Sequence, residues 1–286
     1  MEVNVNWMDP VWRDWFLTWP LLLFFLSIGQ ELRIEFARHA DRRHLLAPVS
    51  AALGGMLIPA SLYLAFSLFT SAPRAAWGIP MATDLPFVLI ALSFFPSPLS
   101  KKIRIFLISL AIADDIGSIL VLGVVTSTHG GIHPTIIGTV LGLLWGGRGF
   151  DVMKKVAYFG ALPLFLIAST SMRFDFSAHA LTDPLVWQLI ASRMIGKPLG
   201  ILLGALIGYA LLRMRHEHAM RLKVRELVIA GFIATLGLDV AVIFANVALA
   251  NESQRALAIL AIFVTIPVSI AGIIFARYFL TRATAA

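Results

Sequence analysis

The 286-residue sequence contains no cysteine and few charged residues. Without cysteine the chain can form neither a disulfide framework nor a thiolate metal site, and cysteine usage gives no information on the redox compartment. Charged residues make up only 14% of the chain and hydrophobic residues 59%, whereas soluble domains carry roughly 25% charged residues. A soluble fold could not bury this much apolar surface, so the composition favours a membrane protein.

Motifs of soluble enzymes are missing as well. The sequence has no nucleotide-binding loop, no HExxH motif and no convincing catalytic triad, and His129 and His133 flank a turn, which is more often a loop feature than a metal site. The net charge of +7 does not indicate nucleic-acid binding, because the basic residues fall in short runs between apolar stretches, where they orient membrane helices. The N-terminus lacks the basic region of a cleavable signal peptide. We therefore expect no enzyme activity, no cofactor and no nucleic-acid partner.

Nine apolar stretches are candidates for crossing the lipid bilayer, which takes about 20 mostly apolar residues. They cover approximately residues 15–35, 45–70, 76–98, 103–127, 132–147, 155–172, 184–212, 226–250 and 256–280. The sequence thus predicts an all-α polytopic membrane protein with about nine transmembrane helices.

The loops between these stretches predict the orientation, because short cytoplasmic loops are enriched in Lys and Arg. With the N-terminus outside, 17 of the 23 Lys and Arg residues lie on the cytoplasmic side, and only Arg13, Arg74, Arg173 and Arg255 lie on the other. The remaining two lie inside a predicted helix. We expect a multi-pass membrane protein with an external N-terminus and a cytoplasmic C-terminus.

Six ionisable residues lie well inside apolar stretches. They are Asp84, Asp114, Asp115, Arg193, Lys197 and Asp239. A charge at the centre of a membrane helix costs about 2.5–3.5 kcal/mol on insertion scales, so such residues normally face a cavity or a partner. Together they indicate either a hydrated functional interior or a set of structural ion pairs between helices.

The three acidic residues of the first half suggest an ion site. Asp84 lies between Pro80 and Pro86, which disrupt the helix, so its carboxylate could cap a broken helix or contact an ion. Asp114 and Asp115 are adjacent, hence about 100° apart on a helix. Two close carboxylates repel each other when both are ionised, so a proton and a hard cation such as Na⁺ or Li⁺ can compete for them.

The basic residues of the second half are candidate counter-charges. Lys197 is desolvated and could act as a switchable counter-ion, whereas Arg193, four residues earlier, remains charged and could pair with Asp239. Glu31 and Glu35 lie at the cytoplasmic end of the first helix, where they could sense pH or simply form a solvated helix end.

Six motifs resemble the NhaA family of bacterial sodium/proton antiporters. These are GQELRIEF (29–36), GIPMATDLPF (78–87), SLAIADDIG (109–117), GIHPTIIGTVLG (131–142), VAYFGALPLF (156–165) and GKPLG (196–200). The resemblance implies that Asp115 is the main carboxylate for Na⁺ and protons, with Asp114 beside it and paired with Lys197. It also places Thr83 and Asp84 where the third and eighth helices, both broken, cross.

The resemblance further implies an inverted-repeat core, a design of which this family is itself a known example. The expected parts are an N-terminal segment with the first panel helix (1–44), a first core repeat (45–127), reduced panel helices (128–172) and a second core repeat (184–280). Compared with the usual family layout, the chain lacks the first span and a pair of helices before residue 131. A homodimer and an unrelated membrane partner over the reduced panel both stay open.

Two residues depart from the family pattern in the core. Arg193 stands where the family has an apolar residue in the seventh helix. Asp239 stands where it usually has a small polar or apolar residue in the eighth, and an acquired ion pair would explain both departures.

The leading hypothesis is a secondary antiporter that exchanges protons for Na⁺ or Li⁺ by alternating access. The alternatives are a non-transporting subunit or scaffold of a membrane complex, and an uncoupled proton or cation pathway.

Overall fold

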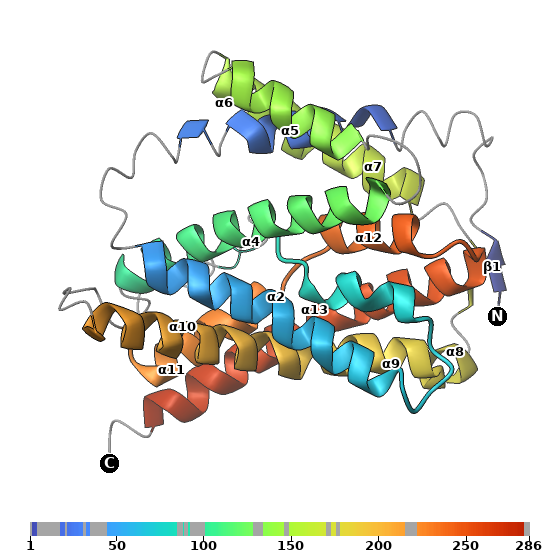
Figure 1. Ribbon diagram of the computed structural model, residues 1–286. Coiled ribbons are helices and arrows are strands. Elements are labelled where there is room, and N and C mark those ends of the chain that lie inside the picture. Colours follow the sequence, from blue (N-terminus) through green and yellow to red (C-terminus); the bar gives the residue numbers. More distant parts are fainter. Residues whose placement is uncertain are drawn as a thin grey trace.

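Figure 1 shows the computed structural model of the chain, in which most of the described residues are helical. The structure describes residues 2–4, 18–20, 22–30, 33–34, 45–84, 88, 91, 101–127, 134–145, 149–169, 173–175, 178–214 and 222–282. All statements below on absent or counted features concern these residues.

Most helices belong to one group, called here the core bundle. It consists of α2 (Leu46–Phe66), the 3-10 helix η2 (Arg74–Met81), α4 (Lys101–Ser127), α8 (Ala178–Thr182), α9 (Pro184–Ala191), the π-helix η4 (Ser192–Gly196), α10 (Lys197–Met214), α11 (Val224–Ala234), α12 (Asp239–Ala248) and α13 (Glu252–Arg282). A smaller group, called the panel, consists of the helical residues 22–30, α5 (Pro134–Trp145), α6 (Phe150–Val156), the π-helix η3 (Ala157–Ala161) and α7 (Leu162–Ser169).

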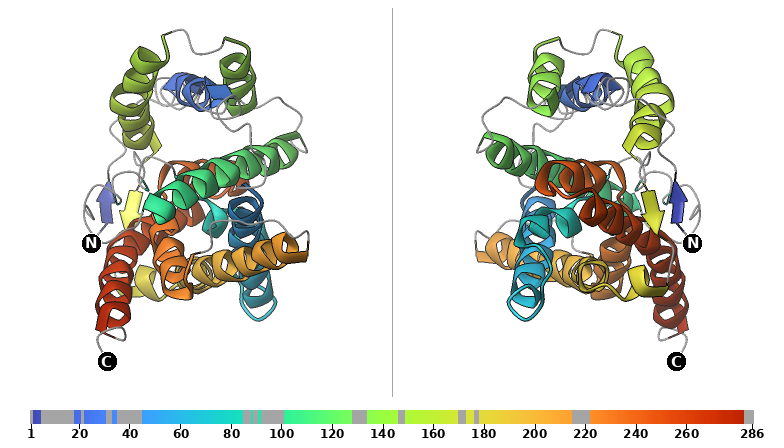
Figure 2. Two further views of the ribbon diagram at one scale, coloured as in Figure 1. Left: turned by 90° about the vertical axis from the view of Figure 1, so that its left-hand side faces the viewer. Right: turned by 90° about the vertical axis from the view of Figure 1, so that its right-hand side faces the viewer.

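The panel lies on one side of the core bundle, as the views in Figures 1 and 2 agree. It meets the bundle where α5 contacts α4 and α7 contacts α12. Within the core bundle α2 and α10 form the most extensive helix pair. The side chains that carry charge at bilayer depth all come from the core bundle, so the panel supports the site from outside.

Four described helices are long and apolar enough to cross a membrane. They are Leu46–Phe66, Lys102–Val124, Pro184–Met214 and Glu252–Phe275, and Thr18–Gln30 and Ile136–Trp145 are shorter apolar helices. Large apolar side chains such as Phe69, Leu144 and Phe159 are exposed on the outside, as expected of a surface that contacts lipid. These features fit the predicted all-α polytopic membrane protein, while the count of nine spans and the inverted repeat stay predictions.

Glycines on α10 allow it to approach α2 at backbone distance. Gly200, Gly204 and Gly208 of α10 follow one another at intervals of four residues, and Gly196 at the end of η4 precedes them by the same interval. A Cβ atom on Gly200 would lie 2.2 Å from the carbonyl oxygen of Gly54, and one on Gly204 would lie 2.2 Å from that of Ser50. Small residues at this spacing are a common means of packing membrane helices. The helix that begins with Lys197 is thereby held firmly against α2.

The panel contains a second close helix pair. A Cβ atom on Gly142 of α5 would lie 2.1 Å from the carbonyl oxygen of Leu26. At the end of α5, the guanidinium of Arg33 donates to the carbonyl of Leu143 over 2.7 Å, which satisfies one of the free acceptors of a helix C-terminus. The panel therefore keeps its own internal packing despite its small size.

Two short strands, which the sequence did not predict, join distant parts of the chain. β1 (Glu2–Asn4) pairs antiparallel with β2 (Arg173–Asp175), and Val3 lies opposite Phe174. Strands of three residues are too short to show a hydrophobic alternation. The pair ties the N-terminal residues to the segment that leads from the panel into the core bundle.

The glycine contacts of α10 can be tested with a matched pair of variants. Gly204→Ala should destabilise the protein by about 1–3 kcal/mol, because the added methyl group forces α2 and α10 apart. Gly160→Ala should change stability by less than about 0.5 kcal/mol, because a Cβ atom there meets nothing within 4 Å. Unfolding of both purified variants in detergent measures the difference, and equal stabilities would contradict the packing argument.

Candidate functional site

The first half of the candidate site is a break after η2. The 3-10 helix ends at Met81, Ala82 is extended with φ −65° and ψ 137°, and residues 82–84 belong to no helix. Pro80 lacks the N–H that a continuing helix needs, and Pro86 disfavours helical geometry in the residue before it. The predicted unwinding of the chain at Asp84 is confirmed.

A second break separates α11 from α12. After α11 ends at Ala234, the N–H of Leu236 turns back to the carbonyl of Ile233 over 3.1 Å, and α12 begins only at Asp239. Gly237 lies within this break, and a Cβ atom there would come within 2.5 Å of the Arg193 guanidinium. The predicted break within the apolar stretch 226–250 is observed, while its place as the eighth span stays a prediction.

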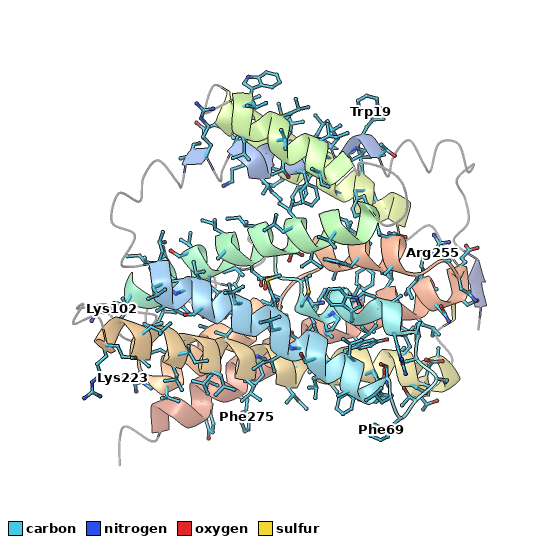
Figure 3. The ribbon with its side chains drawn as sticks, viewed as in Figure 1. Trp19, Phe69, Lys102, Lys223, Arg255 and Phe275 are labelled. Atoms are coloured by element: carbon cyan, nitrogen blue, oxygen red, sulfur yellow. The ribbon has the colours of Figure 1, made fainter. Side chains whose placement is uncertain are left out.

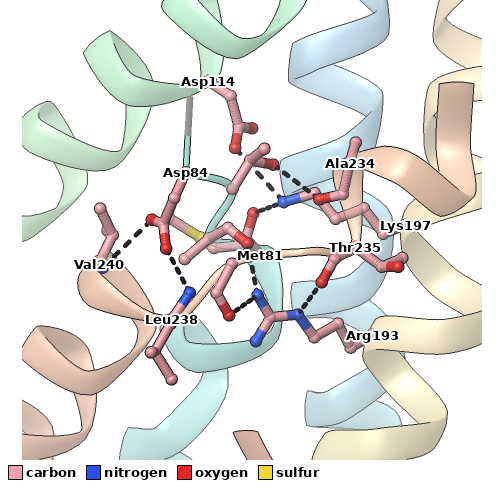
Figure 4. Close-up of polar contacts among 12 residues, drawn as sticks. Met81, Asp84, Asp114, Arg193, Lys197, Ala234, Thr235, Leu238 and Val240 are labelled. Carbon is pink, nitrogen blue, oxygen red and sulfur yellow. Dashed lines mark hydrogen bonds and ion pairs between the residues drawn. The ribbon is translucent and has the colours of Figure 1, made fainter. Parts of the chain in front are cut away.

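The two breaks lie directly against each other (Figure 4). The hydroxyl of Thr83 donates to the carbonyl of Ala234 over 3.2 Å. The carboxylate of Asp84 accepts from the N–H of Leu238 and, over 3.3 Å, from the N–H of Val240. These N–H groups lie at the start of α12, where the helix has free donors and a partial positive charge. Asp84, which lies in the first break, thus caps the start of α12 in the second.

A π-turn positions the two cations of the site. The helix from Pro184 to Met214 is interrupted at η4, and Lys197 follows immediately. Pro198 has no N–H to donate to the carbonyl four residues earlier, and wider turns often accommodate such a defect. Arg193 lies in the π-turn and Lys197 directly after it, and both side chains reach the crossing of the two breaks (Figure 4).

Arg193 binds backbone carbonyls of both breaks. Its Nε donates to Thr235 over 3.0 Å, and its Nη2 donates to Gly237 over 2.6 Å and to Ala82 over 3.2 Å. The side chain of Asp239 lies outside the described residues, so the Arg193–Asp239 ion pair stays a prediction. Three carbonyls already supply acceptors for the buried guanidinium.

Lys197 connects the first break to α4. Its ammonium group donates to the carbonyl of Met81 and lies 3.3 Å from Oδ2 of Asp114. This is the ion pair that the family resemblance implies. The other oxygen of that carboxylate, Oδ1, is buried and makes no hydrogen bond within the described part of the chain. An acceptor is thus left available beside the crossing.

The charges at the crossing are almost completely removed from solvent. Exposure is 1% for Asp84, Asp114 and Arg193, 0% for Lys197 and 6% for Asp115. Asp115 follows Asp114 on α4, as the sequence dictates, and it too is buried. Among the described residues, no group of three or more His, Asp or Glu could hold a metal ion. A cation at this site would therefore need backbone or water oxygens in addition to the carboxylates.

Some predicted residues lie outside what the structure describes. Glu31 and Glu35, the candidate pH sensors, and His129 and His133 are among them. Their proposed roles stay predictions.

The backbone carbonyls and Gly237 are the parts of the site that sequence reasoning missed. A carbonyl group has no side-chain signature, so the search for a partner of Arg193 led to Asp239. The only available signal was a glycine between two apolar helical stretches, which often marks a close approach of another group.

Comparison with known proteins agrees with this arrangement. The model of the family described as Na+/H+ antiporter 1 matches residues 3–129 and 125–276. The junction of the two matches falls where the resemblance led us to expect a missing pair of helices.

Relatives cover most of the chain. An Na(+)/H(+) antiporter NhaA 1 from Flavobacterium johnsoniae is 30% identical over 91% of this chain and 83% of its own length. An Na(+)/H(+) antiporter NhaA from Escherichia coli K12 is 29% identical over 87% of this chain and 76% of its own. One from Bifidobacterium breve is 28% identical over 90% and 73%, respectively. The chain belongs to the NhaA-type Na⁺/H⁺ antiporter family, which is a family of transporters and not of enzymes.

Proposed function

We propose that the chain is a secondary antiporter that exchanges protons for Na⁺ or Li⁺ across the bacterial inner membrane. The single observation that carries the proposal is the meeting of two buried carboxylates, Asp84 and Asp114, with two buried cations at two broken helices, with a third buried carboxylate, Asp115, next to Asp114 in the chain. Buried charges of this kind normally mark an ion or proton pathway in a membrane protein. Relatives that are named as Na⁺/H⁺ antiporters support the same assignment.

In this proposal Asp115 and Asp114 hold either the cation or a proton. Oxygen ligands suit a hard cation, and a protonated carboxyl group loses the charge that attracts one, so the two ions exclude each other. Oδ1 of Asp114, for which the described residues supply no hydrogen-bond donor of good geometry, provides a buried acceptor, and Thr83 lies beside the same carboxyl group. Backbone and water oxygens complete the cation's shell. Lys197 is the counter-charge that compensates Asp114 when no cation is bound.

The proposed movement is alternating access around the crossing of the two breaks. Residues 45–127 and 184–280 form the two inverted core repeats, residues 1–44 and 128–172 supply the panel, and about nine helices span the membrane. The tight packing of α2 on α10 supports movement of the core as a body. A homodimer or another membrane protein covers the reduced panel.

The proposed orientation has the N-terminus in the periplasm and the C-terminus in the cytoplasm. Figure 3 places Lys102 and Lys223 at one end of the bundle and Arg255 at the other, which is the division that the loop charges predict. In Figure 1, β1 lies near the start of α13, whereas the C-terminal end of the chain lies at the opposite end of that helix. Both observations support a chain that begins and ends on opposite sides.

The second candidate is a non-transporting subunit of a membrane complex. The observation that favours it is the set of three hydrogen bonds by which Arg193 joins the two breaks, because these bonds oppose any rearrangement within the crossing itself. The third candidate, an uncoupled ion pathway, predicts proton leakage without any Na⁺ gradient.

Proteoliposomes that contain a pH-sensitive dye test the exchange directly. Adding Na⁺ or Li⁺ should dissipate a pH gradient with the unaltered chain, and Asp115→Asn should reduce the signal to that of empty liposomes, because an amide can neither ionise nor exchange a proton. The control is Asp151→Asn, which changes an exposed carboxylate on α6 and should leave exchange intact. An unaltered chain that gives no flux but co-purifies with an unrelated membrane protein would favour the subunit.

The cap by Asp84 gives a separate prediction on stability. Asp84→Ala should lower the free energy of unfolding by about 1–3 kcal/mol, because two buried N–H groups at the start of α12 lose their acceptor. Asp84→Asn keeps an acceptor oxygen and should lose less. Thermal unfolding in detergent measures both, with Asp151→Ala as the exposed control. The same stability for Asp84→Ala and the control would argue against the cap.

A further inference from the structure

Arg193 is the charged residue that the proposed exchange does not use. Its side chain is 1% exposed, and its partners are three backbone carbonyls that lie 42, 44 and 111 positions away in the sequence. Two of these carbonyls, Thr235 and Gly237, belong to the second break, and the third, Ala82, belongs to the first. Arg193 therefore links the two breaks directly.

We infer that Arg193 is a positioning residue that joins the two breaks into one unit and gives their crossing a permanent positive charge. The guanidinium fork can hold several acceptors at fixed angles and stays protonated in proteins. Lys197, in contrast, divides its ammonium group between the Met81 carbonyl and the Asp114 carboxylate. Because the permanent charge of Arg193 already serves the carbonyls of the two breaks, Lys197 is free to respond to whether Asp114 holds a proton, a cation or neither. The inference deepens the proposed function. Only the response of Lys197 to Asp114 rests on that function.

The bonds of Arg193 are reinforced by the residues around it. Thr235, whose carbonyl accepts from Nε, also donates through its hydroxyl to Ser269 over 2.8 Å. Ser269 belongs to α13 and donates in turn to the carbonyl of Thr265 over 2.6 Å. Gly237 leaves just enough room for the guanidinium, because a Cβ atom there would lie 2.5 Å from Nη2. The second break is thus fixed both by Arg193 and by α13.

The absence of cysteine from the chain makes an experiment on the breaks possible. A single cysteine at Leu236, a buried position of the second break, reports local opening through its rate of labelling by N-ethylmaleimide. Arg193→Met should raise this rate by about ten-fold or more, because three buried carbonyls lose their donor and the breaks separate more often. Arg193→Lys should give an intermediate rate.

Two further variants separate positioning from a general loss of fold. Ser192→Ala changes the neighbouring buried residue of η4, whose hydroxyl makes no hydrogen bond within the described residues, and should label like the unaltered chain. Gly237→Ala keeps the charge but displaces the guanidinium, and should raise the rate. A second reporter cysteine at Ala205, which is buried in α10, should stay slow in all variants. Faster labelling of this reporter in Arg193→Met would mean that the variant has lost its general fold. In that case the labelling rates of Gly237→Ala and Arg193→Lys decide whether Arg193 has a positioning role.

The pH profile of exchange tests the charge itself. Arg193 faces Asp84, Asp114 and Lys197, while the side chain of Asp239 lies outside the described residues. Arg193→Met removes a positive charge beside these carboxylates, so the competition between protons and cations at the site should change and the pH profile should shift. Arg193→Lys and Gly237→Ala keep the charge and should keep the profile.

The labelling experiment tests the positioning role of Arg193, and the flux experiment tests the proposed antiporter, so either can be refuted without the other. Unchanged labelling of Leu236→Cys in both Arg193→Met and Gly237→Ala would overturn the positioning role, whether or not the chain transports ions. Faster labelling in both variants, together with no exchange by the unaltered chain, would support the positioning role and refute the antiporter. An unshifted pH profile in an active Arg193→Met variant would overturn the role of the charge.

Discussion

The structure depends on the pairing of backbone groups that two broken helices leave free within the membrane. No water is available in the hydrocarbon region, so free N–H and carbonyl groups must find partners inside the protein. The donors at the start of α12 are taken by Asp84, and the acceptors at the ends of η2 and α11 are taken by Lys197 and Arg193. Each helix end therefore meets a side chain of opposite polarity.

This pairing explains why the site is both charged and stable. Buried carboxylates and cations would be costly alone, but here each is compensated by a helix end, by an opposite charge or by both. A protein that binds ions in turn needs charges that are not fully satisfied. Asp114, with one oxygen beside Lys197 and the other without a hydrogen bond in the described part of the chain, combines the two conditions.

Much of this site could be predicted from the sequence, because its side chains are conspicuous in an apolar background. Two prolines around Asp84 predicted the first break, and the motif resemblance predicted the pairing of Lys197 with Asp114. The partners of Arg193 could not be predicted, because carbonyl groups exist at every residue and only the fold selects three of them. The pairing of β1 with β2 was missed because its strands are too short for a pattern. The number of spans and the repeat symmetry rest on segments that the structure describes only in part.

The π-turn η4 constrains how the chain can change in length. A wider turn holds one residue more than an α-helical turn, and each residue of a helix adds about 100° of rotation. Loss of one residue from Ser192–Gly196 could therefore be absorbed by conversion of the π-turn to an α-helical turn, and the glycines of α10 would keep their contacts with α2. Loss of one residue within α10 itself would instead rotate everything after it by about 100° and carry the later glycines away from α2. The π-turn is thus the one place in this helix that has a residue to spare.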